Sequence, residues 1–165
     1  MTTQINKAID TIFFYLKRRK YEFVERLDES QYLFRKADEK TCIFIFPFLG
    51  IKKLSQKMLT EMVKKYKTSF TNIIIIVEQI PITLSYDTNV QVYILKELQV
   101  NVLKHYFVPT AYIVSSDFQK KLQNQYKHFP HISQKDPVAK ALHLKKGQLC
   151  MFIRKNGDKY FRKLI

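Results

Sequence analysis

The sequence predicts an α+β protein with two units: a mixed sheet flanked by helices at the N-terminus and a smaller α+β unit at the C-terminus. Two continuous apolar runs, Cys42–Phe46 and Ile73–Val77, have the length and residue types of buried strands. An amphipathic helical pattern from about Ile51 to Lys67 separates them, which is the order of a βαβ crossover with both strands inside a sheet. After the stretch Leu103–Pro109 the pattern changes to short helices and a hairpin, so the boundary of a second unit falls in this stretch.

A further helix precedes the first buried strand. Its apolar residues recur with helical spacing from Ile5 to Leu16, with polar residues between them. The basic run Lys17–Lys20 follows, at the end of the helix where the dipole favours cations. After the second buried strand, Val90–Ile94 and Leu98–Leu103 predict two more strands, the latter because it alternates apolar and polar residues.

Helix-start signals define the first half of the C-terminal unit. We predict a helix over Asp117–Lys127, with Ser115 or Ser116 as its N-cap. Asp136-Pro137 predicts a second, short helix, because Asp suits the cap and Pro suits the first helical position, where the N–H it lacks would have no partner. This helix should end near Leu142–His143.

A β-hairpin is predicted at the end of the sequence. Gly147 makes a turn into a strand over Leu149–Arg154, and Asn156-Gly157 is a tight-turn signal before the returning strand Tyr160–Ile165. The boundary between the units falls near Leu103–Pro109. We therefore divide the chain into residues 1–104 and 105–165.

The chain is strongly basic, with a net charge of +15. Residues 1–104 carry 17 basic and 11 acidic residues, and residues 105–165 carry 12 and 3. This excess favours contact with nucleic acid or with an acidic protein surface, although lysine-rich surfaces also keep proteins soluble. No apolar run is long enough to cross a bilayer, and the N-terminus lacks the layout of a signal peptide, so we expect an intracellular protein without membrane contact.

The sequence lacks the residue patterns of common enzymes, such as a Gly-rich phosphate loop, a nucleophile elbow or a zinc-protease motif. Asp38-Glu39 is the nearest approach to an acidic metal cluster, but its position before an apolar run favours a hairpin turn. His128 and His131 are separated by Pro130 and do not share a helical face. We expect no catalytic residue, metal, cofactor or small-molecule substrate, and a binding or scaffold role instead.

The two cysteines, Cys42 and Cys150, lie far apart in apolar, strand-like runs. In a reducing compartment each is expected to be a small buried hydrophobe rather than half of a disulfide. Two cysteines alone do not complete a zinc site.

The C-terminal third carries a specific motif. Asp136–Gln148 reads Asp-Pro-Val-Ala-Lys-Ala-Leu-His-Leu-Lys-Lys-Gly-Gln, and Phe152-Ile153-Arg154 and Tyr160-Phe161-Arg162 follow it. Upstream stand Asn101–His105 and Val108-Pro109. This pattern resembles the family formed by the fifth subunit of the nuclear RNA polymerases and its archaeal counterpart. The resemblance is strong in the C-terminal third and extends at the level of pattern through the rest of the chain.

The resemblance implies a subunit with an N-terminal jaw domain beside downstream DNA and a C-terminal assembly domain docked on the largest polymerase subunit. Archaeal members have the second domain alone, so both domains together indicate a eukaryotic or eukaryotic-virus form. A cellular protein would then act in the nucleus, and a viral one in the cytoplasm, in a viral factory or a virion. Departures such as the short turn Lys155–Asp158, and Ala111-Tyr112 where the family usually has a His, suggest a divergent lineage.

The resemblance also implies partner-binding residues. Arg154 and Arg162 on paired strands suit backbone carbonyls or carboxylates of a partner, while ordinary exposed strand cations are an equal alternative. Asp136, Pro137 and Gly147 belong to the same motif, although a helix cap and a turn explain Asp136 and Gly147 better than contacts do.

Basic residues of the N-terminal unit are candidates for contact with downstream DNA, through phosphates and without regard to sequence. For the run after the first helix, a solvated helix end is the favoured alternative. These candidates are Lys17, Arg18, Arg19, Lys20, Lys52 and Lys53.

Two other interpretations stay open. One is a free-standing basic nucleic-acid-binding protein, which the charge supports although no recognition module is found. The other is a metal-dependent nuclease that would use Asp38 or Glu39, for which fold analogy is the only support.

Overall fold

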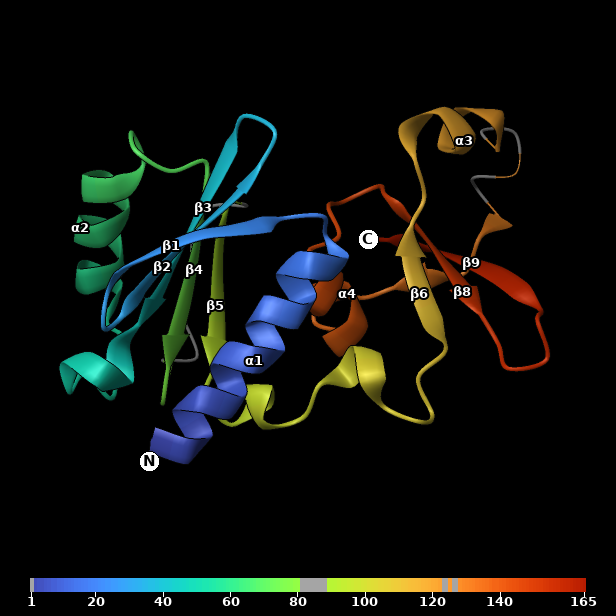
Figure 1. Cartoon of the computed structure of the whole chain (residues 1–165). Coiled ribbons are helices and arrows are strands. Elements are labelled where there is room, and N and C mark those ends of the chain that lie inside the picture. Colours follow the sequence, from blue (N-terminus) through green and yellow to red (C-terminus); the bar gives the residue numbers. More distant parts are fainter. Residues whose placement is uncertain (1, 81–88, 123–124, 126–127) are drawn as a thin grey trace. The chain divides into compact units, whose positions relative to one another are not determined.

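The computed structural model describes residues 2–80, 89–122, 125 and 128–165. The chain forms two compact units, Met1–Val100 and Asn101–Ile165, and each has a sheet of its own (Figure 1). The predicted α+β fold class is confirmed. The division after Val100 comes slightly before the boundary drawn from the sequence, and the assignment of residues 1–104 and 105–165 as domains stays a prediction.

The N-terminal unit is built on a five-stranded mixed sheet in the order β1-β2-β3-β4-β5. β1 (Glu22–Asp28), β2 (Gln31–Lys36) and β3 (Glu39–Ile45) are antiparallel neighbours. β4 (Asn72–Val77) lies parallel to β3, and β5 (Val90–Ile94) lies parallel to β4. The parallel pairing of β3 with β4 confirms the predicted βαβ crossover.

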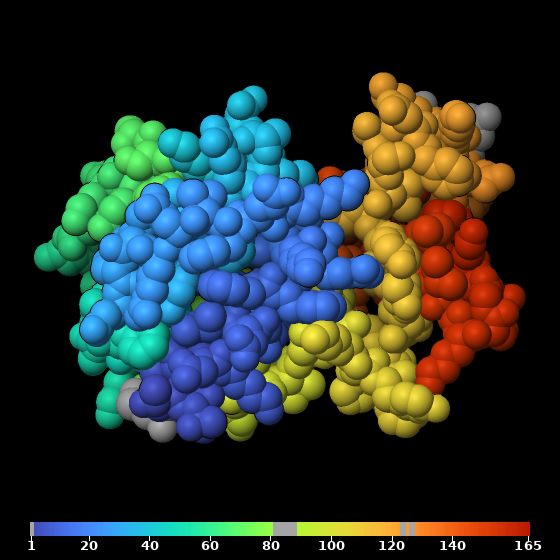
Figure 2. Space-filling view, viewed as in Figure 1, coloured from blue at the N-terminus to red at the C-terminus, as the bar shows by residue number. Residues whose placement is uncertain are grey.

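The edge strand β1 is not among the strands predicted from the sequence. All seven of its residues are exposed, and it forms part of the surface seen in Figure 2. Its register with β2 shifts after Phe23 and again after Arg26. Its apolar and polar residues do not alternate regularly, so the strand signal in the sequence is unclear here, although the ring of Phe23 stacks on that of Phe13 at 5.7 Å. Bulges and charged residues on an edge strand disfavour pairing with another chain.

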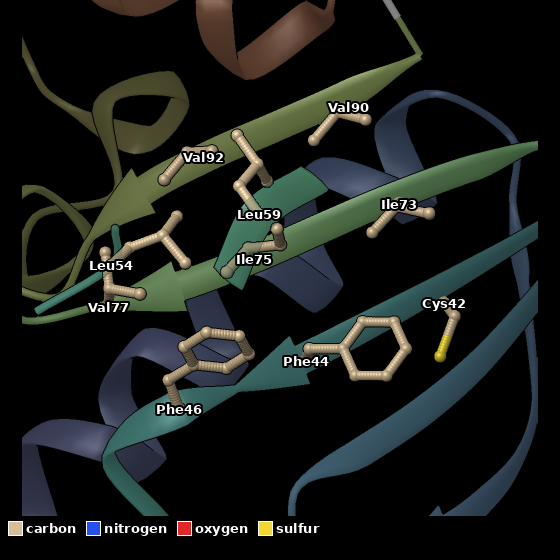
Figure 3. Close-up of a cluster of buried hydrophobic side chains, with 10 residues drawn as sticks. All are labelled: Cys42, Phe44, Phe46, Leu54, Leu59, Ile73, Ile75, Val77, Val90 and Val92. Carbon is tan, nitrogen blue, oxygen red and sulfur yellow. The ribbon is translucent and has the colours of Figure 1, made fainter. Parts of the chain in front are cut away.

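One face of this sheet is covered by α2 (Gln56–Tyr66), which begins at the N-cap Ser55. Every second residue of β3, β4 and β5 lies on this face, as the alternation of side chains along a strand requires. The packing is dominated by aliphatic and aromatic side chains (Figure 3). The buried members are Cys42, Phe44, Phe46, Leu54, Leu59, Ile73, Ile75, Val77, Val90 and Val92.

The opposite face is covered by α1 (Thr2–Arg18), whose predicted helical pattern is confirmed. The ring of Tyr15 lies 6.4 Å from the ring of Tyr93, which alternates along β5 with the residues that face α2. The N-terminal unit is thus a sheet between two helices. The buried residues of α1 are Ile5, Ala8, Thr11, Ile12, Tyr15 and Leu16.

The prediction of a strand over Leu98–Leu103 is wrong. Two short 3-10 helices, η2 (Glu97–Gln99) and η3 (Val102–Lys104), occupy this stretch. The side chain of Asn101 accepts a hydrogen bond from the backbone N–H of Leu103 at 3.2 Å. Such local side-chain bonds compete with a sheet ladder, so Asn101 begins a helical turn here.

A four-stranded sheet in the order β6-β8-β9-β7 forms the C-terminal unit. β6 (Thr110–Ile113), β8 (Leu149–Ile153) and β9 (Lys159–Leu164) are antiparallel neighbours, and the short β7 (His131–Ile132) lies parallel to β9. The predicted terminal hairpin is confirmed by β8 and β9. Its turn contains Gly157 at φ 90°, a backbone conformation that favours glycine.

One face of this second sheet packs against α4 (Pro137–Leu142). The predicted start and end of this helix are confirmed, with Asp136 as N-cap and His143 as C-cap. The core includes the second cysteine, Cys150. Its buried members are Ala111, Ile132, Val138, Ala139, Leu142, Leu144, Cys150, Phe152 and Leu164.

The helix predicted over Asp117–Lys127 is shorter in the structure. α3 spans Ser116–Lys121, and the side chain of Ser115 accepts a hydrogen bond from the N–H of Phe118 at its start. The helix ends at its C-cap, Leu122. Residues 123–124 and 126–127 of the predicted helix lie outside the described residues. In the part of the chain that is described, no helix has the length and apolar character to cross a membrane.

Candidate docking site of the C-terminal unit

The two arginines predicted to bind a partner lie beside the same aromatic ring. Arg154 directly follows β8, and Arg162 lies in β9 opposite Cys150. The Cζ atoms of Arg154 and Arg162 are 4.9 Å and 5.9 Å from the centroid of the Tyr160 ring. On its strand pair, Tyr160 is opposite Phe152, and their rings are stacked at 5.1 Å with an angle of 10° between their planes.

This arrangement can present two guanidinium groups to a partner. Both arginine side chains are exposed, and Tyr160 is half-buried. A cation above an aromatic ring gains roughly 0.5–1 kcal/mol at an exposed site, which restricts where each guanidinium lies. A guanidinium is a planar fork of donors that matches carboxylates and backbone carbonyls. The chemistry that this site offers is therefore the recognition of hydrogen-bond acceptors.

Tyr160 was not among the predicted site residues. The signal was present in the sequence, because residues two apart on a strand share a face and Tyr160 is two residues before Arg162. The contribution of Arg154 to the same ring depends on the hairpin register, which sequence spacing alone does not define.

Asp136 and Pro137 form the start of α4. The Oδ1 atom of Asp136 accepts hydrogen bonds from the N–H groups of Val138 at 2.8 Å and Ala139 at 3.3 Å, and Pro137 occupies the first turn. The predicted capping role is confirmed. A direct contact of either residue with a partner stays a prediction.

Gly147 lies in a turn with φ 83°, where glycine is favoured. Its N–H donates to the carbonyl of Leu164 at 3.0 Å, and its own carbonyl accepts from Nε2 of Gln119 at 3.0 Å. Oε1 of Gln119 accepts from the N–H of Leu149 at 3.3 Å, so this α3 side chain joins the turn to β8. Sequence reasoning did not identify Gln119, since the contact spans 28–30 residues.

Arg19 does not fit its predicted role as a DNA contact. Its side chain is 8 % exposed, and its guanidinium donates to Oε1 of Gln91 at 2.7 Å and to the hydroxyl of Tyr93 at 3.0 Å. Burial also raises the pKa of Tyr93, so this phenol stays neutral. Arg19 thus ties the end of α1 to β5, and its charge is enclosed by protein rather than presented to a phosphate.

The other basic candidates of the N-terminal unit are exposed, but they form two separate groups. The first group is the end of α1 together with Lys20. It lies near the start of β4, because the hydroxyl of the next residue, Tyr21, accepts a hydrogen bond from Asn72 there. The second is Lys52-Lys53, where Lys53 pairs with Gln79 beyond the end of β4. The two groups lie at opposite ends of the sheet, separated by the length of β4, about 20 Å for a strand of its size.

The acidic pair Asp38-Glu39, considered for metal binding, lies at a hairpin turn, as predicted. Lys36 at the end of β2 pairs with Glu39 at the start of β3, which leaves Asp38 in the turn. A carboxylate oxygen of Glu39 accepts a hydrogen bond from the hydroxyl of Tyr21, whose pKa is raised to about 12 by burial and by this contact. Within residues 2–80, 89–122, 125 and 128–165, no three His, Cys, Asp or Glu side chains are grouped as a metal site would require.

Cys42 and Cys150 are buried free thiols, as predicted. Burial raises the pKa of each thiol to about 12. Since the thiolate is the reactive form, neither cysteine is suited to nucleophilic chemistry.

Residues 100–160 match the family described as RNA polymerase Rpb5, C-terminal domain. The matched stretch contains β6, α4 and β8, includes Arg154, and ends at Tyr160, so it covers most of the candidate docking site. The two-unit α+β architecture agrees with this family. The C-terminal unit therefore matches the C-terminal domain of the Rpb5 family of RNA polymerase subunits.

Proposed function

We propose that the chain is a non-catalytic structural subunit of a DNA-directed, multisubunit RNA polymerase. The observation that carries the proposal is the family match over residues 100–160, which spans nearly the whole C-terminal unit. The chemistry of RNA synthesis then belongs to other subunits. The chain contributes rigid surfaces of defined charge.

The C-terminal unit docks on the largest subunit of the polymerase. Arg154 and Arg162, held beside Tyr160, supply donors to backbone carbonyls or carboxylates of that subunit. Residues 105–165 carry 12 basic and 3 acidic residues. This positive charge favours docking on an acidic surface of the partner.

The N-terminal unit lies near downstream DNA. Its exposed basic residues at the two ends of the sheet contact phosphates, since Lys17, Lys20 and Lys52-Lys53 are all exposed. Such contacts are individually weak and independent of sequence, which suits DNA that moves past the enzyme. Arg19 is not part of this surface, because it is buried.

The compartment follows from the host of the polymerase. A cellular enzyme would place the chain in the nucleus, and a viral enzyme would place it in the cytoplasm, in a viral factory or a virion. The second candidate function is a free-standing nucleic-acid-binding protein, which the net charge of +15 favours.

Cross-linking of the purified polymerase with a lysine-reactive reagent, followed by mass spectrometry, tests the docking. Lys155 and Lys159 are exposed and lie in the hairpin between the two arginines, so we expect them to form cross-links to the largest subunit. A variant with Arg154→Ala and Arg162→Ala should lose these cross-links. The proposed docking would be contradicted if this hairpin formed no cross-link to any polymerase subunit.

A further inference from the structure

The two most exposed large apolar side chains of the described residues are neighbours. Tyr106 is 72 % exposed and Phe107 is 83 % exposed. They are the central residues of a turn from His105 to Val108, closed by a hydrogen bond from the N–H of Val108 to the carbonyl of His105 at 3.0 Å. Side chains of this size are seldom left in water without a reason, and adjacent exposed aromatic residues often mark an interaction site.

This turn is anchored on both sides. Val102 and Leu103 before it, and Val108 after it, pack against the core of the C-terminal unit. The N–H of His105 donates to the carbonyl of Val102 at 3.2 Å. The segment, yellow in Figure 2, reaches the surface. The two rings are therefore presented by a backbone that is already ordered, which lowers the entropy lost on binding.

A cation from a second element lies beside the turn. The Nζ atom of Lys155, in the β8–β9 turn, is 2.9 Å from the centroid of the Tyr106 ring. The rings of Tyr106 and Phe107 meet edge to face, with centroids 5.2 Å apart and planes at 85°. Tyr106, Phe107 and Lys155 together form what we call the aromatic turn patch. It combines an apolar centre with positive charge, on a unit that is itself strongly basic.

We propose that the aromatic turn patch docks an acidic protein segment that carries an aromatic or aliphatic side chain. The apolar side chain packs on Phe107, and a neighbouring carboxylate pairs with Lys155. Charge complementarity argues for an acidic partner, since residues 105–165 carry 12 basic and 3 acidic residues. Aromatic residues are enriched at the centres of protein interfaces, where a few residues carry most of the binding energy.

Single-stranded nucleic acid fits the patch less well. Stacked bases need aromatic platforms with open faces and similar orientation. Here the ammonium group of Lys155 covers one face of Tyr106, and the 85° angle prevents the two rings from stacking on successive bases. The patch shares Lys155 with the hairpin of the proposed docking site, but its affinity for an acidic segment can be tested on the isolated chain, without any polymerase subunit.

Fluorescence anisotropy with the purified full-length chain tests the inference. The probe is a short labelled peptide of alternating Glu and Phe, and the comparison probes are the same peptide with Ser in place of Phe and a labelled single-stranded oligothymidine. We expect Phe107→Ala and Lys155→Glu each to weaken binding of the Glu-Phe peptide at least tenfold. Phe107 is so exposed that its removal should leave the thermal midpoint unchanged, which excludes misfolding as the cause.

Two variants serve as matched controls. Leu49→Ala removes a side chain that is 55 % exposed in the other unit, and Lys146→Glu makes the same charge change as Lys155→Glu at another exposed lysine. Both should bind the Glu-Phe peptide as the wild type does. The inference would be overturned if the chain did not bind the Glu-Phe peptide, or if it bound the Glu-Ser peptide equally well. It would also be overturned if the chain bound the oligothymidine more tightly than the Glu-Phe peptide and Phe107→Ala abolished that binding.

Discussion

The guanidinium carbon of Arg154 lies 4.9 Å from the centre of the Tyr160 ring, on the hairpin that ends the chain. The same ring has Arg162 at 5.9 Å and stacks on Phe152 at 5.1 Å. Phe152 is buried in the core of the C-terminal unit. Tyr160 therefore connects the two arginines of the proposed docking site to the core, and its ring orients the charges that a partner would meet.

Replacing Tyr160 should separate the effect of its ring from that of its hydroxyl. Tyr160→Leu removes both cation–π contacts, each worth roughly 0.5–1 kcal/mol, so we expect affinity for the largest polymerase subunit to fall about tenfold. Tyr160→Phe keeps the ring and should bind normally. Surface plasmon resonance measures both, and an equal loss in the two variants would argue against the orienting role.

Arg19 should act as a structural residue. Arg19→Ala removes the two hydrogen bonds that the guanidinium donates to Gln91 and Tyr93, and hydrogen bonds to a charged group contribute about 1.5–3 kcal/mol. The free energy of unfolding of the N-terminal unit, measured in urea, should fall by roughly 2 kcal/mol. Arg19→Lys should not restore it, because one ammonium does not reproduce the two-nitrogen fork. Lys17→Ala, at an exposed position of the same helix end, should change stability little; an equal effect would contradict this account.

The exposed lysines should affect DNA and not assembly. Neutralising Lys52 and Lys53 to Gln should weaken retention of downstream DNA as salt is raised, and lower the salt slope by about 0.9 for each lost phosphate contact. Lys17→Gln with Lys20→Gln at the other end of the sheet should act additively, since the groups are about 20 Å apart. The variants should remain in the polymerase at normal stoichiometry. Dissociation of the subunit would contradict the division of roles between the units.

The cap of α4 should contribute to the stability of the C-terminal unit. Asp136→Ala removes the acceptor of the Val138 and Ala139 N–H groups and should cost about 1 kcal/mol in the free energy of unfolding. Asp136→Ser keeps a capping oxygen and should recover most of this loss. If Asp136→Ala left stability unchanged while docking was lost, Asp136 would be a contact residue rather than a cap.

The buried thiols should make stability fall in alkali. In the unfolded chain the thiols ionise near their ordinary pKa of 9.0, whereas in the fold burial raises the pKa of Cys42 and Cys150 to about 12. Between these values the unfolded state binds fewer protons than the folded state, so stability decreases as pH rises, and below them the thiols add no pH dependence. Urea unfolding across this interval should show a smaller loss in a Cys42→Ala, Cys150→Ala variant. An identical slope would show that other groups are responsible.

Features with local causes were predicted well from the sequence. Asp136-Pro137 begins α4 because the cap bonds reach only two and three residues ahead. Asn156-Gly157 forms the terminal turn through an equally local cause, the positive φ angle of Gly157 between β8 and β9. The continuous runs of β3 and β4 predicted two buried parallel strands, since strands covered on both faces have no need to alternate.

Features that depend on distant residues were not predictable in this way. Arg19 looked like one more exposed cation in a basic run, and only its contact with Gln91, 72 positions away, shows that it is buried. The alternation of Leu98–Leu103 suggested a strand, but Asn101 forms a local turn instead. Tyr106 and Lys155 come together only because the turn from His105 to Val108 and the terminal hairpin meet in the folded unit.

Affinity purification of the tagged chain from its native source, with mass spectrometry of the proteins that accompany it, tests whether the chain is a polymerase subunit. We expect recovery in a stoichiometric complex with two very large polymerase subunits, whose sequences would also identify the host as a cell or a virus. Recovery of the chain alone, or only with nucleic acid, would show that it is not a polymerase subunit and would support a free-standing nucleic-acid-binding protein.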